Sequence, residues 1–215
     1  MKLCLRLSSF LLFSLLFFSC AHPYKSLVAR DTAPSAMRFQ PVFEKELYRC
    51  MVDGRFLLKK FHLSGLLLFK NMEDSSTRVV FQNEMGFSFF DFEWDKQQHF
   101  TIHQIIPQLN KSALVKLLQK DMELLLMNKL EVSTERHFTK EGEDYDRFTL
   151  GKGYAYYISQ RDTLRRIENA GKRKVITIQL GEKNRTADLP QALVFTHHKA
   201  NFTIRLTQIE TQNDE

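Results

Sequence analysis

The sequence has little cysteine, proline or glycine, and each scarcity excludes a class of protein. With three cysteines in 215 residues, the chain cannot be built on a disulfide framework. Five prolines and eight glycines exclude collagen-like and Pro/Gly-rich material. Charged residues make up 26% and hydrophobic residues 43% of the chain, which is typical of a globular protein and argues against wholesale disorder. The length predicts one domain, or one domain with a tail.

Motifs for common enzyme chemistry are also missing: there is no Gly-rich phosphate loop, Cys-x-x-Cys, Gly-x-Ser-x-Gly or His-Glu-x-x-His. His99 and His103 would lie about 13 Å apart on a strand, too far to share a metal ion. Asp91 and Glu93 form a possible carboxylate pair, although a salt-bridged strand end is the more ordinary interpretation. Cys50 is expected to be a small buried side chain rather than a nucleophile. We therefore predict no catalytic residue, no metal ligand, no cofactor and no enzymatic activity.

What the sequence does contain, first of all, is a sorting signal. The first six residues carry two basic side chains and no acid, and residues 7–19 form an uncharged apolar run of 13. This run is shorter than the about 20 residues of a membrane-spanning helix, and a basic start before a short apolar core is typical of a secretory signal peptide. Its end resembles a bacterial lipobox, with a small residue before Cys20. We predict a lipoprotein signal peptide over 1–19 and a lipid anchor on Cys20, with plain secretion as the alternative.

The lipid anchor would set the location of the protein. A diacylglycerol and an amide-linked acyl chain on Cys20 would suffice for stable anchoring in a bilayer. Ala21 follows the cysteine where an inner-membrane retention signal would have Asp, which favours an outer-membrane lipoprotein facing the periplasm. Without its first 19 residues the chain has 29 basic and 25 acidic residues, a net charge of +4, so the mature domain is only mildly positive.

The rest of the chain is predicted to be a tether followed by a sheet. Residues 20–42 hold three of the five prolines and show no apolar period, so we expect a lipid anchor and a flexible tether. From residue 43 apolar and polar residues alternate, as at 61–69 and 202–206, which indicates strands with one buried face. Turn signals separate about ten such strands, so we predict an antiparallel domain over 43–210 and a polar tail over 211–215.

One stretch breaks this alternation. Residues 110–127 place apolar side chains at helical spacing, which predicts an amphipathic helix with Asn110 as its N-cap. Such a helix must bury its apolar face, and the natural place is the concave side of a curved sheet. The predicted fold class is therefore α+β, mainly β with one or two helices: an open antiparallel β-barrel of about ten strands with an amphipathic lid helix at about 110–127.

The most informative predicted strand is rich in phenylalanine. Residues 86–94 read GFSFFDFEW, so large aromatic side chains fall on both faces of the strand. Such a strand is either extra core, which is the more common outcome, or the lining of an apolar cavity. The candidate cavity residues come from this strand and the helix: Phe87, Phe89, Phe90, Phe92, Trp94, Leu114, Leu118 and Met122.

A basic hairpin over residues 161–174 is the clearest charged feature. It supplies five candidates for contact with a membrane or an anion: Arg165, Arg166, Lys172, Arg173 and Lys174. These side chains could meet anionic lipid headgroups, although a solvated face is the more common outcome.

The order of these features resembles two groups of proteins. The closing segments, 189–195 and 202–206, look like the ending of the lipoprotein-localisation family, LolA and LolB. The run Phe-Phe-Asp-Phe-Glu at 89–93, with the helix that follows, resembles a set of uncharacterised Gram-negative outer-membrane lipoproteins over most of residues 44–210. The first resemblance implies an open β-barrel whose helices close a hydrophobic cavity for acyl chains. LolB carries an exposed leucine-bearing loop, whereas the tip at 71–76 is acidic and polar, so no functional residue is carried over.

Together these observations favour a non-enzymatic, periplasm-facing outer-membrane lipoprotein that binds lipid, acyl chains or lipoproteins in a hydrophobic cavity, with lipoprotein or lipid transport as its role. The alternative is a structural or assembly lipoprotein that holds an envelope protein on its sheet surface, which predicts a filled interior and an exposed apolar patch. The expected partners are the membrane, through the N-terminal lipid, and an acyl chain or lipoprotein. Nucleic acid is not expected behind a secretion signal, and the sequence leaves the oligomeric state open.

Overall fold

The computed structural model describes residues 24–56, 59–184 and 189–209. The predicted signal peptide, Cys20 and the predicted tail at 211–215 therefore lie outside the described residues. The helices are η2 (Ala36–Phe39), α2 (Ser112–Leu125) and η3 (Val132–Thr134). The strands are β1 (Val28–Arg30), β2 (Lys45–Phe56), β3 (Lys59–Asn71), β4 (Thr77–Gln82), β5 (Ser88–Trp94), β6 (Phe100–Ile105), β7 (Arg136–Lys140), β8 (Glu143–Thr149), β9 (Tyr154–Gln160), β10 (Thr163–Ala170), β11 (Lys174–Leu180), β12 (Ala192–His197) and β13 (Phe202–Gln208).

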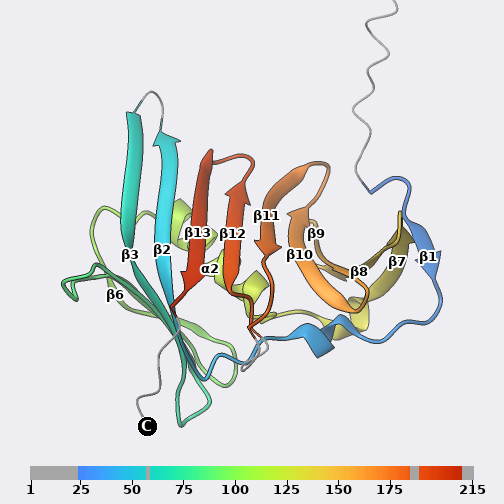
Figure 1. The fold of residues 1–215 in the computed structure, drawn as a ribbon, viewed down its shortest axis with the longest axis horizontal. Helices are drawn as coiled ribbons and strands as arrows, with labels where there is room; N and C mark the ends of the chain where they lie inside the picture. Colours follow the sequence, from blue (N-terminus) through green and yellow to red (C-terminus); the bar gives the residue numbers. More distant parts are fainter. Residues whose placement is uncertain (1–23, 57–58, 185–188, 210–215) are drawn as a thin grey trace, which may run out of the picture.

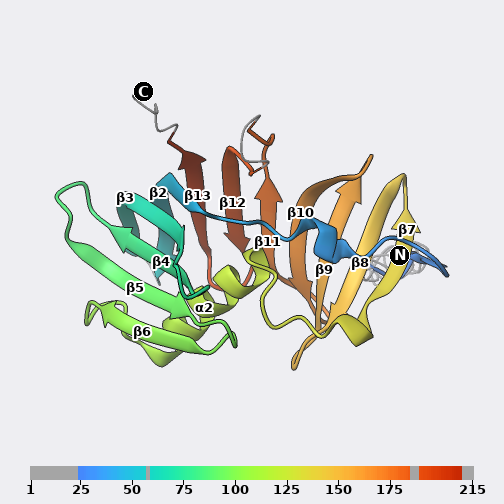
Figure 2. The same cartoon turned by 90° about the horizontal axis from the view of Figure 1, so that it is seen from below.

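Within the described part of the chain, thirteen strands form one sheet in the order β1-β7-β8-β9-β10-β11-β12-β13-β2-β3-β4-β5-β6. Most neighbours in this order are also neighbours in sequence, as expected for a meander. There are two exceptions: β1 pairs with β7 at one edge of the sheet, and β2 pairs with β13 at its centre, so an early hairpin lies beside the last one. The sheet curves around α2, which lies on its concave side (Figures 1 and 2).

The alternation of the sequence explains the strands. In β13, Ile204 and Leu206 are buried while Arg205 and Thr207 face water, and Phe90, Phe92 and Trp94 of β5 are buried in the same alternating way. The prediction of an open, mainly β, antiparallel fold with one helix on its concave face is confirmed. The sheet has thirteen strands rather than about ten. Short strands account for part of this difference, because β1 has only three residues and all are exposed, so it carries no hydrophobic period.

Helix α2 lies within the predicted range 110–127, but its N-cap differs from the prediction. The cap is Lys111, which makes no side-chain capping hydrogen bond. Asn110 instead belongs to the preceding turn, where its backbone N–H donates to the carbonyl oxygen of Ile106 at 3.0 Å. The helix N-terminus therefore lacks the side-chain cap that Asn110 was expected to supply.

The described part of the tether predicted for 20–42 is packed on the sheet rather than free. We call residues 24–44 the strap. β1 pairs with β7, and Tyr24 stacks on Tyr156 with ring centroids 4.0 Å apart. The strap then runs along one end of the sheet to the start of β2 (Figures 1 and 2). On the way it buries Ala36 and Phe43 completely or almost so, at 0% and 3% exposed. These buried contacts are long-range, which is why the local composition did not reveal them.

The core has two parts. The larger lies between α2, the strap and the concave face of the sheet, and includes Phe69, Phe148 and Phe195. The smaller lies on the other side of the sheet, around Tyr24, Tyr156 and Ile158. None of the helices that the structure describes combines the length and the hydropathy needed to cross a membrane.

Candidate functional site

Among the described residues, the side-chain hydrogen bonds that tie helix α2 to the sheet and to the strap all involve its C-terminal half or the residue after it. Four side-chain hydrogen bonds make this attachment: His197 Nε2 with Asp121 Oδ2 (2.7 Å), Trp94 Nε1 to Glu123 Oε1 (3.3 Å), Tyr157 Oη to the Leu124 carbonyl (2.9 Å) and Gln40 Nε2 to the Leu126 carbonyl (3.2 Å). Within the described residues, no comparable hydrogen bond joins the sheet to the first part of α2, residues 112–120. The helix is therefore anchored at one end.

Burial along α2 follows the same gradient. Met122 and Leu118 are 1% and 7% exposed, respectively. Leu117 and Leu114 are only half-buried, and Ala113 is exposed. Because Ala113 and Met122 are separated by about 14 Å along the helix axis, the apolar face loses its contact with the sheet progressively toward the N-terminus.

The space that opens under this end of α2 is a cavity of about 630 Å³. This volume lies within the range of about 300–1,000 Å³ that is common for small-molecule sites. Helix α2 and the residues before it form one wall, and β2, β3, β4, β5 and β13 form the other. The lining residues are Cys50, Val52, Arg55, Phe61, Leu63, Leu67, Phe81, Phe90, Gln108, Leu109, Lys111, Ala113, Leu114, Leu117, Leu118, Met122, Ala200, Phe202 and Ile204.

The described residues that form the floor of the cavity offer no reactive group. It is formed by buried apolar side chains such as Leu67, Phe81 and Ile204. The one ionisable side chain there is Cys50, and burial raises the pKa of its thiol to about 12. The thiol is therefore protonated at neutral pH and is a poor nucleophile. The chemistry that remains is the burial of an apolar ligand.

The predicted cavity residues divide into two groups. Phe90, Leu114, Leu118 and Met122 line the cavity. Phe92 and Trp94 do not, because they lie beneath the anchored half of α2: Phe92 stacks on Phe90 at 4.3 Å, and Trp94 donates its indole N–H to Glu123. These two rings are core.

Phe87 and Phe89 also stay outside the cavity lining. Phe81 pairs with Phe90 and Gln82 pairs with Ser88, which leaves Phe89 as the extra residue of a β-bulge. The bulge lets Phe89 pack against Phe81, at 4.8 Å between ring centroids. Phe87 lies beyond the strand and is 55% exposed. The simple alternation of side chains assumed for residues 86–94 is broken at this bulge.

Sequence reasoning missed the wall that β2, β3 and β13 supply, including Cys50, Val52, Leu63, Phe202 and Ile204. Each of these residues lies on a strand with the expected alternation. What was missing was the order of strands in the sheet, which places β13 beside β2 and opposite α2.

The basic hairpin is only partly free to meet an anion. Arg166 forms a bidentate pair with Glu143, at 2.5 and 2.6 Å, and Arg166 and Lys174 both bind the buried carboxylate of Glu168. These two cations are therefore structural rather than free contacts. The other three candidates, Arg165, Lys172 and Arg173, are exposed.

Both carboxylates of the pair on β5 already have side-chain partners. Asp91 forms an ion pair with Arg78 across β4 and β5. Glu93 contacts His103 Nε2 at 2.9 Å, whereas His99 contacts Asp95. These partners give both carboxylates the salt-bridged environment that was the more ordinary interpretation.

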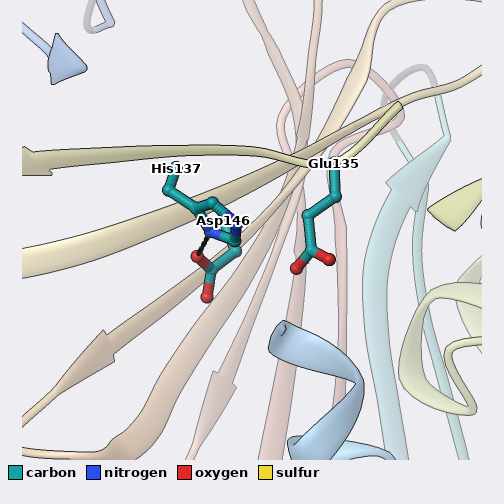
Figure 3. A group of neighbouring side chains, drawn as sticks. All are labelled: Glu135, His137 and Asp146. Atoms are coloured by element: carbon teal, nitrogen blue, oxygen red, sulfur yellow. Dashed lines mark hydrogen bonds and ion pairs between the residues drawn. The ribbon is translucent and has the colours of Figure 1, made fainter. Parts of the chain in front are cut away.

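A second cluster of ionisable groups joins the strap to the sheet (Figure 3). The ligand atoms of Glu135, His137 and Asp146 lie within 4.8 Å of one another. Both carboxylate oxygens of Glu135 already accept hydrogen bonds at 2.7 Å, from the Ser35 hydroxyl and the Ala36 backbone N–H at the start of η2. His137 Nδ1 lies 2.7 Å from Asp146 Oδ1. The cluster is thus accounted for by fixing the strap, and we assign it no metal.

Fold and site together define a class: an open antiparallel sheet with a one-helix lid over an apolar cavity. No family model and no curated protein matches the chain. Among solved structures, it is similar to a domain of an outer membrane lipoprotein-sorting protein from Vibrio parahaemolyticus, at 8% identity and a TM-score of 0.47, over 83% of this chain and 90% of that one.

Two other solved structures are similar in the same way. A LolA superfamily protein from Nitrosomonas europaea matches at 8% identity and a TM-score of 0.47, over 83% of this chain and 93% of that one. A DUF1329 family protein from Desulfovibrio piger matches at 7% identity and a TM-score of 0.43, over 78% and 84%. At 7–8% identity, these are likenesses of fold alone.

Proposed function

We propose that this protein is a non-enzymatic lipid-binding protein that holds an acyl chain in the cavity under α2, as a free lipid or as part of a lipoprotein. The cavity itself is the observation that supports the proposal: about 630 Å³ of space with apolar walls and a lid anchored at one end. Burial of a methylene group contributes about 0.8 kcal/mol, so an acyl chain of ordinary length would bind well in such a space. A role in lipoprotein or lipid transport follows if the chain is handed on.

The experiment is native mass spectrometry of the full chain, followed by extraction and identification of bound lipid. Leu117 lines the cavity and is half-buried, so Leu117→Trp should fill the space and remove the bound lipid. Lys116 is the neighbouring residue on the exposed side of α2, and Lys116→Trp is the matched control that should keep it. A wild-type protein that carries no lipid and takes up none would overturn the proposal.

The place of action is a separate part of the proposal. The lipobox-like end of the apolar run supports a lipid anchor on Cys20 in the outer membrane, with the domain facing the periplasm. Labelling of cells with palmitate and fractionation of their membranes test this, with Cys20→Ser as the variant that should lose both the label and the outer-membrane fraction. The alternative of a structural lipoprotein predicted a filled interior, and the cavity therefore favours the lipid-binding function over it.

A further inference from the structure

The walls of the cavity are apolar, but its opening is not. Among the described lining residues, the exposed ones mark where the cavity meets solvent: Arg55, Phe61, Gln108, Lys111, Ala113 and Ala200. Arg55 comes from β2 and Lys111 is the N-cap of α2. We call these six residues the mouth. The two charged side chains among the described lining residues, Arg55 and Lys111, are both cations and both lie at the mouth.

These two cations have no ion-pair partner among the residues that the structure describes. Neither the Arg55 nor the Lys111 side chain forms an ion pair or a hydrogen bond with any residue that the structure describes. No Asp or Glu is among the described residues that line the cavity. Unpaired cations beside an apolar surface attract anions, and the attraction is strongest where solvent is partly excluded.

A polar recess of about 390 Å³ adjoins the mouth. It shares Arg55 and Phe202 with the apolar cavity and adds Lys60 and Asp53. The Asp53 carboxylate does not neutralise these cations, because it is already bonded to His62 at 2.7 Å and to Arg205. Apolar and cationic surfaces therefore lie side by side, with Arg55 common to both.

We propose that the ligand is an anionic amphiphile: an acyl chain in the apolar cavity with a carboxylate or phosphate headgroup held at the mouth by Arg55 and Lys111. This inference rests on the proposed function and names the class of lipid that it binds. An oxyacid headgroup suits the site because a guanidinium can donate two parallel hydrogen bonds to carboxylate or phosphate oxygens. The ammonium of Lys111 adds a second charge from the lid side, so the headgroup would bridge the lid and the sheet.

The test compares three ligands that share one acyl chain and differ in headgroup. Palmitic acid, palmitoyl lysophosphatidic acid and neutral monopalmitoylglycerol each displace a fluorescent apolar probe from the full chain, kept in solution by an amphipathic polymer. The anionic ligands are expected to bind about tenfold more tightly than the neutral one, the size expected when two exposed ion pairs add together. The preference should shrink as the salt concentration rises, and the tighter anion identifies the headgroup.

Charge reversal provides the second arm. Arg55→Glu with Lys111→Glu should abolish the preference for anions while the neutral ligand keeps its affinity, which also shows that the variant is folded. The matched control is Arg49→Glu with Lys116→Glu, two exposed positions on the same elements that do not line the cavity. If the reversed protein does not fold, Arg55→Gln with Lys111→Gln replaces it and should bring anionic and neutral ligands to equal affinity.

The outcomes separate this inference from the proposed function. The inference of an anionic ligand is overturned if the wild type binds all three ligands with equal affinity. It is also overturned if the preference for anions survives the double substitution at Arg55 and Lys111. Either result leaves acyl-chain binding intact. Failure of all three ligands to displace the probe overturns the proposed function, and the inference falls with it.

Discussion

Asp121 of α2 and His197 of β12 meet at 2.7 Å in the interior, where each side chain is only 3% exposed. Burial raises the pKa of Asp121 to about 6. The hydrogen bond with His197 and the electrostatic interaction with that ring lower the pKa, but by less than burial raises it. The ring of His197 in turn stacks on Phe202 at 3.9 Å, and Phe202 lines the cavity. One buried contact therefore connects the anchored half of the lid helix to the wall of the ligand site.

Asp121→Asn is expected to remove a pH dependence of stability. The folded protein keeps the Asp121 proton up to about pH 6, whereas the unfolded chain releases it near the ordinary pKa of about 4. Between these values the folded state binds more protons, so the free energy of unfolding of the wild type, relative to the variant, falls as pH rises from about 4 to about 6. Denaturant unfolding of both proteins across this range measures the difference.

Asp95 provides a control, because its effect on stability should change with pH in the opposite direction. Hydrogen bonds from His99 to the exposed Asp95 carboxylate lower its pKa, so its contribution to stability is present at neutral pH and is lost as pH falls. Asp95→Asn should therefore cost more stability at neutral than at acid pH. The role assigned to the buried pair would be contradicted if the difference in the free energy of unfolding between wild type and Asp121→Asn stayed constant from about pH 4 to about pH 6.

Glu135→Ala is expected to loosen the strap. The carboxylate accepts hydrogen bonds from the Ser35 hydroxyl and the Ala36 backbone N–H, and the loss of such capping contacts costs about 1–2 kcal/mol. Ala36 is fully buried, so opening of the strap should also expose residues 24–44 to proteases. Unfolding and limited proteolysis measure the two effects. The control is Glu73→Ala at an exposed turn, and equal protease resistance of the two variants would show that Glu135 does not hold the strap.

Much of the fold could be predicted because its signals are local. Helix α2 and strands such as β13 follow from hydrophobic periods of a few residues, and these periods also placed Phe90, Leu118 and Met122 at the site. The remainder depends on long-range contacts. Cys50 and Ile204 share a cavity wall only because β13 pairs with β2. The strap has no period of its own, since partners far away in the sequence hold it in place.

Gly65→Ala is expected to destabilise the sheet beside the cavity. An added Cβ would lie 2.1 Å from the carbonyl oxygen of Gln82 and 3.1 Å from the ring of Phe81, so β3 and β4 would have to move apart. Overpacking of this kind costs about 1–3 kcal/mol. Because Phe81 lines the cavity, ligand affinity should fall as well. Gly151→Ala is the control, because a Cβ there meets nothing within 4 Å. An undiminished melting temperature and affinity in Gly65→Ala would refute the close approach.

Cys50 gives a direct measure of whether a ligand occupies the cavity. Its thiol lines the cavity, is 2% exposed and has a pKa raised to about 12 by burial. Because the thiolate is the reactive form, labelling by a thiol reagent at neutral pH should be slow, and a small apolar reagent should reach the thiol through the mouth. Saturating palmitic acid is expected to slow this labelling severalfold by filling the same space. Mass spectrometry follows the label, and Cys50→Ala subtracts reaction at other cysteines. If palmitic acid displaces the fluorescent probe yet leaves the labelling rate of Cys50 unchanged, the acyl chain lies somewhere other than under α2.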